Sequence, residues 1–224
     1  MNYKIQAQTK QLMKATLALC ITSLFLGTVI SGCLGDGFRT NNDEITVSSP
    51  TWTKSDFWEY SVKTSNLEVS TTMVVATDND ATDYYVGTGS LEDAKRHAVL
   101  NHNPALGRVQ ISDFAIYENN QPQKIIDFPL KVSKSWSFSL YGEDEFVASV
   151  IDINNGKAEI SAVSDSGARL SYIFSQDARW LSYFEFINEN GEANLVMELA
   201  NYGTGFTGNA YFCRGGDLYD KEFE

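Results

Sequence analysis

The stretch FVASVIDINNGKAEISAV, residues 146–163, decides the fold class of this chain. Residues 146–153 and 157–163 are rich in β-branched side chains, and Asn154-Asn155-Gly156 separates them. An Asn-Gly step between two such segments is a strong signal for a β-hairpin. Turn sequences of a similar kind follow at residues 165–167 and 188–191. The sequence therefore predicts antiparallel strands joined by tight turns.

The same strand signal recurs along the chain at the short spacing that is typical of an all-β domain. The predicted strands are residues 57–63, 67–77, 82–86, 108–117, 125–128, 136–140, 146–153, 157–163, 169–174, 180–187, 193–201 and 211–213. We therefore expect a mainly β domain with an antiparallel meander. A β-sandwich is the alternative.

Residues 90–101 interrupt the β pattern with a helical one. Ser90 followed three residues later by Asp93 is a variant capping box, in which Asp stands where Glu is usual. Leu91, Ala94 and Ala98 then repeat at helical spacing. An Asn-rich stretch and a proline end the pattern. We expect one short helix here.

Two segments of the chain are similar to each other. SDFWEYSV, residues 55–62, aligns with SKSWSFSL, residues 133–140. In both, a Trp, a second aromatic residue and an aliphatic residue alternate at spacing two, and a second strand and a turn follow. The similarity indicates an internal two-fold repeat, and chance likeness between β-strands is the alternative.

The charge balance limits the partners. The chain has 17 basic and 29 acidic residues and a formal net charge of −12. Such a surface repels nucleic acid phosphates and anionic lipid headgroups, so we expect no nucleic-acid partner. Aromatic residues make up 12% of the chain, which favours a packed core over a disulfide framework.

The N-terminus has the three parts of a secretory signal peptide. Lys4, Lys10 and Lys14 precede an uncharged run at residues 15–30, and small residues then lead to Cys33. The uncharged run has 16 residues, whereas a membrane-spanning helix needs about 20. An ordinary signal, cleaved or uncleaved, with an incidental Cys is the alternative.

Residues Ile30-Ser31-Gly32-Cys33 resemble the lipobox of prokaryotic lipoproteins, in which an aliphatic residue and two small residues precede an invariant Cys. The resemblance implies diacylglyceryl transfer to the Cys33 thiol and cleavage before Cys33. It implies a lipid-anchored protein at the cell membrane, facing outside the cytoplasm. Two acyl chains hold a protein on a bilayer where one is marginal, because each buried CH₂ contributes roughly 0.8 kcal/mol.

The expected organisation follows from this signal. It comprises a lipoprotein signal peptide at residues 1–32, a flexible tether at 33–50, a single antiparallel β domain at 51–213 and an acidic tail at 214–224. Removing residues 1–32 from the 224 residues leaves 192, enough for one domain with a sizeable core. Lipidation of Cys33 leaves Cys213 as a single spare thiol. A Cys33–Cys213 disulfide is the alternative if Cys33 carries no lipid.

A second resemblance concerns the domain. The step from Phe128-Pro129-Leu130 into Trp136, with later strands containing Trp180 and Met197-Glu198-Leu199, looks like patterns in prokaryotic surface lipoproteins. That resemblance implies a curved antiparallel sheet or half-barrel. The helix would lie against or beside its concave face, as in periplasmic lipoprotein-carrier folds. The resemblance names no activity.

Aromatic residues at even spacing within their strands are the candidate ligand-binding residues. We expect them to line one sheet face, where most of them fill the core. The alternative is a concave aromatic face that binds an apolar ligand or a glycan. The residues are Trp58, Tyr60, Trp136, Phe138, Trp180 and Phe184.

Candidates for catalysis are few. Asp93 lies one helical turn before His97, and His102 lies just past the expected helix end, so these three residues are the candidates for general-base or metal chemistry. No HExxH, CxxC or G-x-S-x-G motif accompanies them. We expect no metal and no cofactor.

Two further motifs fail their structural context. Gly203-Thr204-Gly205-Phe206-Thr207-Gly208 fits G-x-G-x-x-G, but no βαβ unit can follow it, so we expect a turn. A loop that begins at Asp78 has Asp83 and Gly89 where an EF-hand requires Gly and Glu, so we expect an Asx-rich turn, with a noncanonical surface calcium site as the alternative. The lipobox, the aromatic-rich strands and the lack of a catalytic motif lead us to expect a membrane-anchored binding or carrier domain for an apolar ligand or a partner protein. A hydrolase that uses His97 or His102 and a structural cell-envelope protein are the alternatives.

Overall fold

The computed structural model describes residues 45–77, 84–93, 109–118, 121–142, 145–214 and 217–222. The expected signal peptide with Cys33, residues 78–83 and both histidines lie outside these residues. The strands, in chain order, are β1 (Thr46–Val47), β2 (Phe57–Thr64), β3 (Glu68–Thr77), β4 (Tyr84–Thr88), β5 (Val109–Gln110), β6 (Ile116–Glu118), β7 (Gln121–Gln123), β8 (Leu130–Lys131), β9 (Ser135–Phe138), β10 (Phe146–Asn154), β11 (Lys157–Ser164), β12 (Arg169–Ser175), β13 (Trp180–Ile187), β14 (Ala193–Gly203), β15 (Asn209–Arg214) and β16 (Asp217–Glu222).

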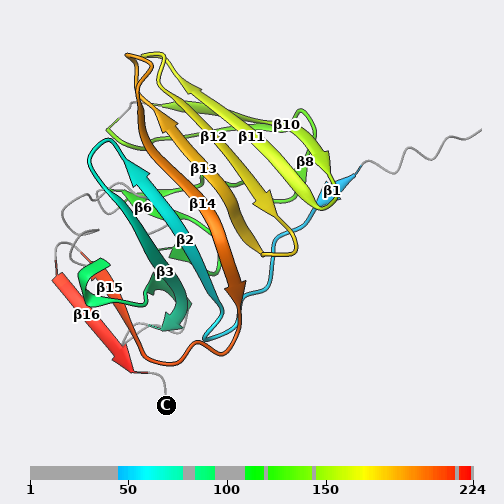
Figure 1. Ribbon diagram of the computed structural model, residues 1–224. Coiled ribbons are helices and arrows are strands. Elements are labelled where there is room, and N and C mark those ends of the chain that lie inside the picture. Colours follow the sequence, from blue (N-terminus) through cyan, green and yellow to red (C-terminus); the bar gives the residue numbers. More distant parts are fainter. Residues whose placement is uncertain are drawn as a thin grey trace, which may run out of the picture. The chain divides into compact units, whose positions relative to one another are not determined.

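Two consecutive meanders form one antiparallel sheet (Figure 1). The strand order is β7-β6-β5-β4-β3-β2-β14-β13-β12-β11-β10-β9, and β15 and β16 attach beside β4. Each meander keeps its chain order, and the two join where β14, the last strand of the second, pairs with β2, the first strand of the first. The expected antiparallel β fold is therefore confirmed, as an open sheet rather than a sandwich or a closed barrel.

The sheet curves around one hydrophobic core. Side chains from β4 and β6 in the first meander belong to the same buried cluster as side chains from β10 and β12 in the second. Alternation within a strand produces this face: in β12, Leu170, Tyr172 and Phe174 are buried, whereas Arg169 and Ser171 are exposed. Full burial of each large apolar side chain contributes roughly 1.5–3 kcal/mol.

The connection between β7 and β8 helps to fill the concave side of the sheet. Ile125 and Ile126 are almost completely buried in the core cluster. The Tyr172 hydroxyl on β12 donates a hydrogen bond to the Ile125 carbonyl, at 2.6 Å. The predicted strand at residues 125–128 is therefore wrong, because Ile125 and Ile126 bury their side chains against the sheet and none of the four residues joins a strand ladder.

The predicted internal repeat is confirmed by the backbone of the two meanders. Ser55 and Ser133, which align in sequence, have φ angles of 67° and 68°. Their N–H groups donate to the carbonyls of Val75, at 2.9 Å, and of Val150, at 3.0 Å. The strand registers also correspond, since Trp58 pairs with Met73 and Trp136 pairs with Ala148.

The equivalence extends to the turn that follows the fourth strand of each meander. Residues Gln110 to Ala115 make the turn between β5 and β6, and residues Ser175 to Trp180 make the turn between β12 and β13. The penultimate residue of each turn has positive φ, 57° at Phe114 and 61° at Arg179. The repeat unit is therefore a whole meander rather than one hairpin.

Three predicted boundaries differ from the structure. The predicted strand 108–117 is split by a turn, in which the Asp113 carboxylate accepts the Ala115 N–H at 2.9 Å. β1 lies within the predicted tether, because Val47 is buried in the core. Much of the predicted acidic tail, Asp217–Glu222, pairs with β15 as β16.

The predicted helix start is confirmed: residues 91–93 are helical, and the Asp93 N–H donates to the Ser90 hydroxyl at 3.0 Å. Residues 94–108 lie outside the described residues.

Candidate functional site

The six aromatic residues proposed from the sequence lie on the inner face of the sheet. Trp58, Tyr60, Phe138, Trp180 and Phe184 are buried in the core cluster, and Trp136 packs against it partly buried. The Trp58 indole N–H donates to the Ala178 carbonyl, at 2.6 Å, and the Tyr60 hydroxyl to the Leu181 carbonyl, at 2.7 Å. Their role as core residues, which the sequence favoured, is confirmed.

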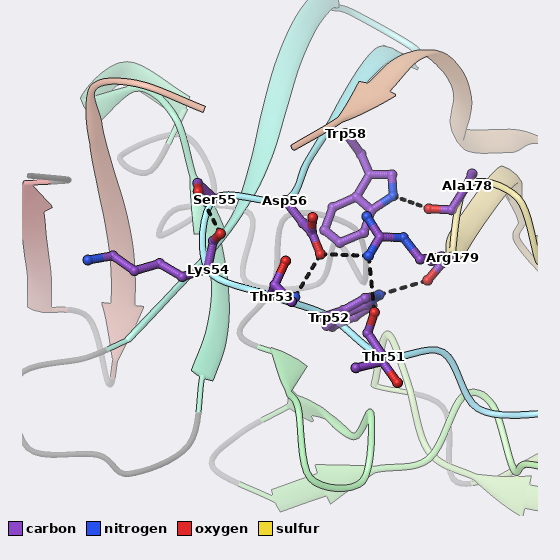
Figure 2. Close-up of polar contacts among 9 residues, drawn as sticks. All are labelled: Thr51, Trp52, Thr53, Lys54, Ser55, Asp56, Trp58, Ala178 and Arg179. Atoms are coloured by element: carbon purple, nitrogen blue, oxygen red, sulfur yellow. Dashed lines mark hydrogen bonds and ion pairs between the residues drawn. The ribbon is translucent and has the colours of Figure 1, made fainter. Parts of the chain in front are cut away.

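A polar cluster joins the two meanders beside these aromatic residues. It combines the segment before β2, residues 51–56, with the turn before β13, residues 178–179 (Figure 2). Arg179 Nη1 lies 2.9 Å from Asp56 Oδ2 and donates to the Thr51 carbonyl at 3.1 Å. The Thr53 N–H also donates to Asp56 Oδ2, at 2.7 Å. We call this cluster the Asp56–Arg179 clamp.

Aromatic rings surround the Asp56–Arg179 clamp. The Trp52 ring lies 5.1 Å from the Trp58 ring, 4.9 Å from Trp180 and 4.8 Å from Phe114, measured between centroids. The Trp52 indole N–H donates to the Arg179 carbonyl, at 2.8 Å. Edge-to-face and tilted ring pairs of this kind are worth about 0.5–1.5 kcal/mol each beyond their buried area.

The Asp56 carboxylate is enclosed rather than presented to a substrate. The Asp56 side chain is 1% exposed and that of Arg179 is 32% exposed. Asp56 Oδ1 is buried and has no hydrogen-bond partner within the described residues. The Asp56 carboxylate is therefore placed to link residues 51–56 to Arg179 rather than to meet a substrate at the surface.

The Asp56–Arg179 clamp was not predicted from the sequence. The two residues lie 123 positions apart and match no catalytic or metal motif. The repeat provides the one available clue, since Lys134 stands at the position equivalent to Asp56 and also forms an ion pair. Its ammonium lies 2.8 Å from Asp127 Oδ2, so a charge of the opposite sign at this position forms a local ion pair in the second meander.

The remaining candidates are placed as follows. Asp93 is buried at the start of the helix, and His97 and His102, its proposed partners, lie outside the described residues. Cys33 lies outside them as well, and Cys213 belongs to β15. The segment from Gly203 to Gly208 joins β14 to β15, so its prediction as a turn is confirmed.

Comparisons with protein-family models, with curated proteins and with solved structures found no match to this chain. Within the described residues, no three His, Cys, Asp or Glu side chains gather closely enough to hold a metal ion. The part of the chain that the structure describes also has no helix that is long and apolar enough to cross a membrane.

Two buried tyrosines on the inner face make stability depend on pH. Burial raises the pKa of Tyr60 and of Tyr172 well above the ordinary value of 10.0. Because the folded-state pKa is raised, the stabilisation is complete below pH 10 or so and is lost as pH rises further. We expect the denaturant concentration at the unfolding midpoint to decrease once the pH exceeds that value, as tyrosinate absorbance appears.

Tyr60→Phe tests this assignment. The variant leaves the Leu181 carbonyl without its donor and should cost about 1–2 kcal/mol of unfolding free energy at neutral pH. Its stability should also fall less steeply with pH than that of the unmodified chain, since one buried phenol is gone. An unchanged alkaline slope would show that Tyr60 does not contribute to the pH dependence.

Proposed function

We propose that this protein is a lipid-anchored, extracytoplasmic lipoprotein whose β domain binds a partner protein. The anchor is supported by the order of charge, apolar run and Ile30-Ser31-Gly32-Cys33 at the N-terminus. The described domain begins at Ile45, so eleven residues, 34–44, separate it from Cys33. A lipid on Cys33 would thus hold the domain on a short tether at the membrane surface.

The packing of the domain favours a protein partner over an apolar ligand in the concave face. Five of the six candidate aromatic side chains are already buried in the core cluster, and Trp136 packs against it partly buried. In contrast, Val147, Ile151 and Val163 on the outer face are 46–58% exposed. Exposed aliphatic side chains that gather on one surface are typical of protein interaction sites. This exposed group carries the binding proposal.

Cys33→Ser tests the anchor. The substitution removes the thiol that would receive the diacylglyceryl group, so we expect the protein to leave the membrane fraction or to remain unprocessed. Fractionation and the intact mass of the mature N-terminus measure the outcome. Cys213→Ser is the matched control, since that thiol lies in the domain. It should leave both the processing of the N-terminus and the membrane fractionation unchanged. The lipoprotein assignment would be contradicted if Cys33→Ser altered neither the membrane attachment nor the mass of the mature N-terminus.

A further inference from the structure

The two meanders differ at their free edges, although their backbones correspond. In the first meander, the outward edge of β2 is covered by β14, in which Gly203, Asn201 and Glu198 pair with Phe57, Glu59 and Ser61. In the second meander, the equivalent edge is that of β9, with Ser135, Ser137 and Ser139 at the matching positions. Among the strands that the structure describes, β9 pairs with β10 alone.

The hydrogen-bond pattern shows which groups of β9 face outward. Val150 exchanges backbone hydrogen bonds with Ser133 and Lys134. Because hydrogen-bonded and non-hydrogen-bonded pairs alternate in an antiparallel ladder, the N–H and C=O groups of Ser135 and Ser137 point away from β10. The Ser139 N–H, next along the chain, donates to the Gln123 side chain of β7 at 2.8 Å. An edge with free backbone groups is a template for another strand.

The outer faces of the two meanders differ in the same way. In the first, Val74 and Ala76 of β3 are buried beneath Phe206 and Ala210, in the segment that continues from β14. The Phe206 ring also lies against Gly89, where an added Cβ would come within 2.9 Å of it. In the second meander, the same outer face of β10 carries Val147 and Ile151, which are 52% and 58% exposed. Val163 lies on β11, pairs with Val147 and is 46% exposed.

We propose that a partner polypeptide binds this open corner, defined as the edge of β9 with Val147, Ile151 and Val163. The partner segment adds an antiparallel strand to Ser135 and Ser137 and then packs an aromatic side chain against the aliphatic residues of the outer face. The chemistry is that of the chain's own segment from β14 to Ala210, which covers the equivalent edge and face of the first meander as one continuous stretch. Such a segment is extended, carries aliphatic residues at alternate positions and ends in a glycine-rich turn with Phe.

This inference deepens the proposed partner-binding role, and it does not depend on lipidation of Cys33. The probe is a synthetic peptide with the sequence of Ala193–Ala210, added to the full chain in detergent. We expect saturable binding by calorimetry. Val147→Asp places a carboxylate under the bound segment and should weaken binding at least about tenfold, since a buried unpaired charge is costly. Ser137→Pro removes an outward N–H and should have a similar effect.

Leu67→Asp is the matched control, because Leu67 is an exposed aliphatic residue in the β2–β3 hairpin of the other meander. It should leave peptide binding unchanged. Should Ser137→Pro fail to fold, Val147→Asp and Val163→Asp retain the test, since both side chains are exposed. Absence of peptide binding, or equal binding by all variants, would overturn the proposal. Self-association of the chain that Val147→Asp abolishes would also overturn it, in favour of a second copy as the occupant.

The lipid anchor and the open corner are tested independently of each other. Cys33→Ser should bind the peptide as the unmodified chain does, because the corner is built from residues of β9, β10 and β11 alone. Loss of membrane attachment with retained peptide binding supports both assignments. Retained attachment in Cys33→Ser, with peptide binding intact, removes the lipoprotein assignment and leaves the open corner supported.

Discussion

Trp58→Ala is expected to lower the free energy of unfolding by about 3–5 kcal/mol, the range for truncating a large aromatic side chain in a core. The Trp58 side chain is 1% exposed, contacts the Trp52 ring and donates to the Ala178 carbonyl across the two meanders. The substitution thus removes buried apolar area, opens a cavity and leaves a carbonyl without its donor. Chemical denaturation measures the loss as a shift in the midpoint.

The repeat supplies a matched control for this prediction. Trp136 occupies the equivalent position, but it is only partly buried and its indole N–H has no partner within the described residues. Trp136→Ala should therefore cost roughly half as much, since less area is buried and no hydrogen bond is lost. Replacement by Phe separates the two terms: Trp58→Phe should cost about 1–2 kcal/mol more than Trp136→Phe. Equal losses at both positions would contradict the role given to the Trp58 hydrogen bond.

Local features of the fold could be predicted from the sequence because they depend on neighbouring residues. Asn154-Asn155-Gly156 joins β10 to β11 at the expected place, and Asn155 and Gly156 have positive φ angles of 48° and 71°. Asn and Gly tolerate this conformation, which the tightest hairpin turns require. The Ser90 cap and the repeat at Ser55 and Ser133 are local in the same sense.

The non-local features could not be predicted in this way. The pairing of β14 with β2 joins residues more than a hundred positions apart, and many pairings of alternating strands would satisfy the same pattern. The open corner exists because β2 gained this neighbour and β9 did not. The Asp56–Arg179 clamp likewise depends on the two meanders meeting at β2 and β14. Conversely, residues 111–114 read as strand, yet the Asp113 carboxylate stabilises a turn there.

Arg179→Met is the second substitution with a large expected effect. It keeps an unbranched apolar side chain of similar length. The Asp56 carboxylate, however, stays buried, and the Thr53 N–H is its one remaining hydrogen-bond donor among the described residues. Breaking a buried ion pair costs about 3–5 kcal/mol, and the partial exposure of Arg179 lowers the expected loss to about 2–4 kcal/mol. Denaturation at neutral pH measures it.

The local ion pair of the second meander provides the control for Arg179→Met. The Lys134 and Asp127 side chains are 19% and 37% exposed, so Lys134→Met should cost about 1 kcal/mol or less. Combining Arg179→Met with Asp56→Asn removes the buried charge and should recover part of the loss, with a coupling of about 1–2 kcal/mol. Strict additivity of the two substitutions would show that Asp56 and Arg179 do not stabilise the domain as a pair. The burial of Asp56 is the reason to expect coupling, because solvent screens a buried charge less than one at the surface.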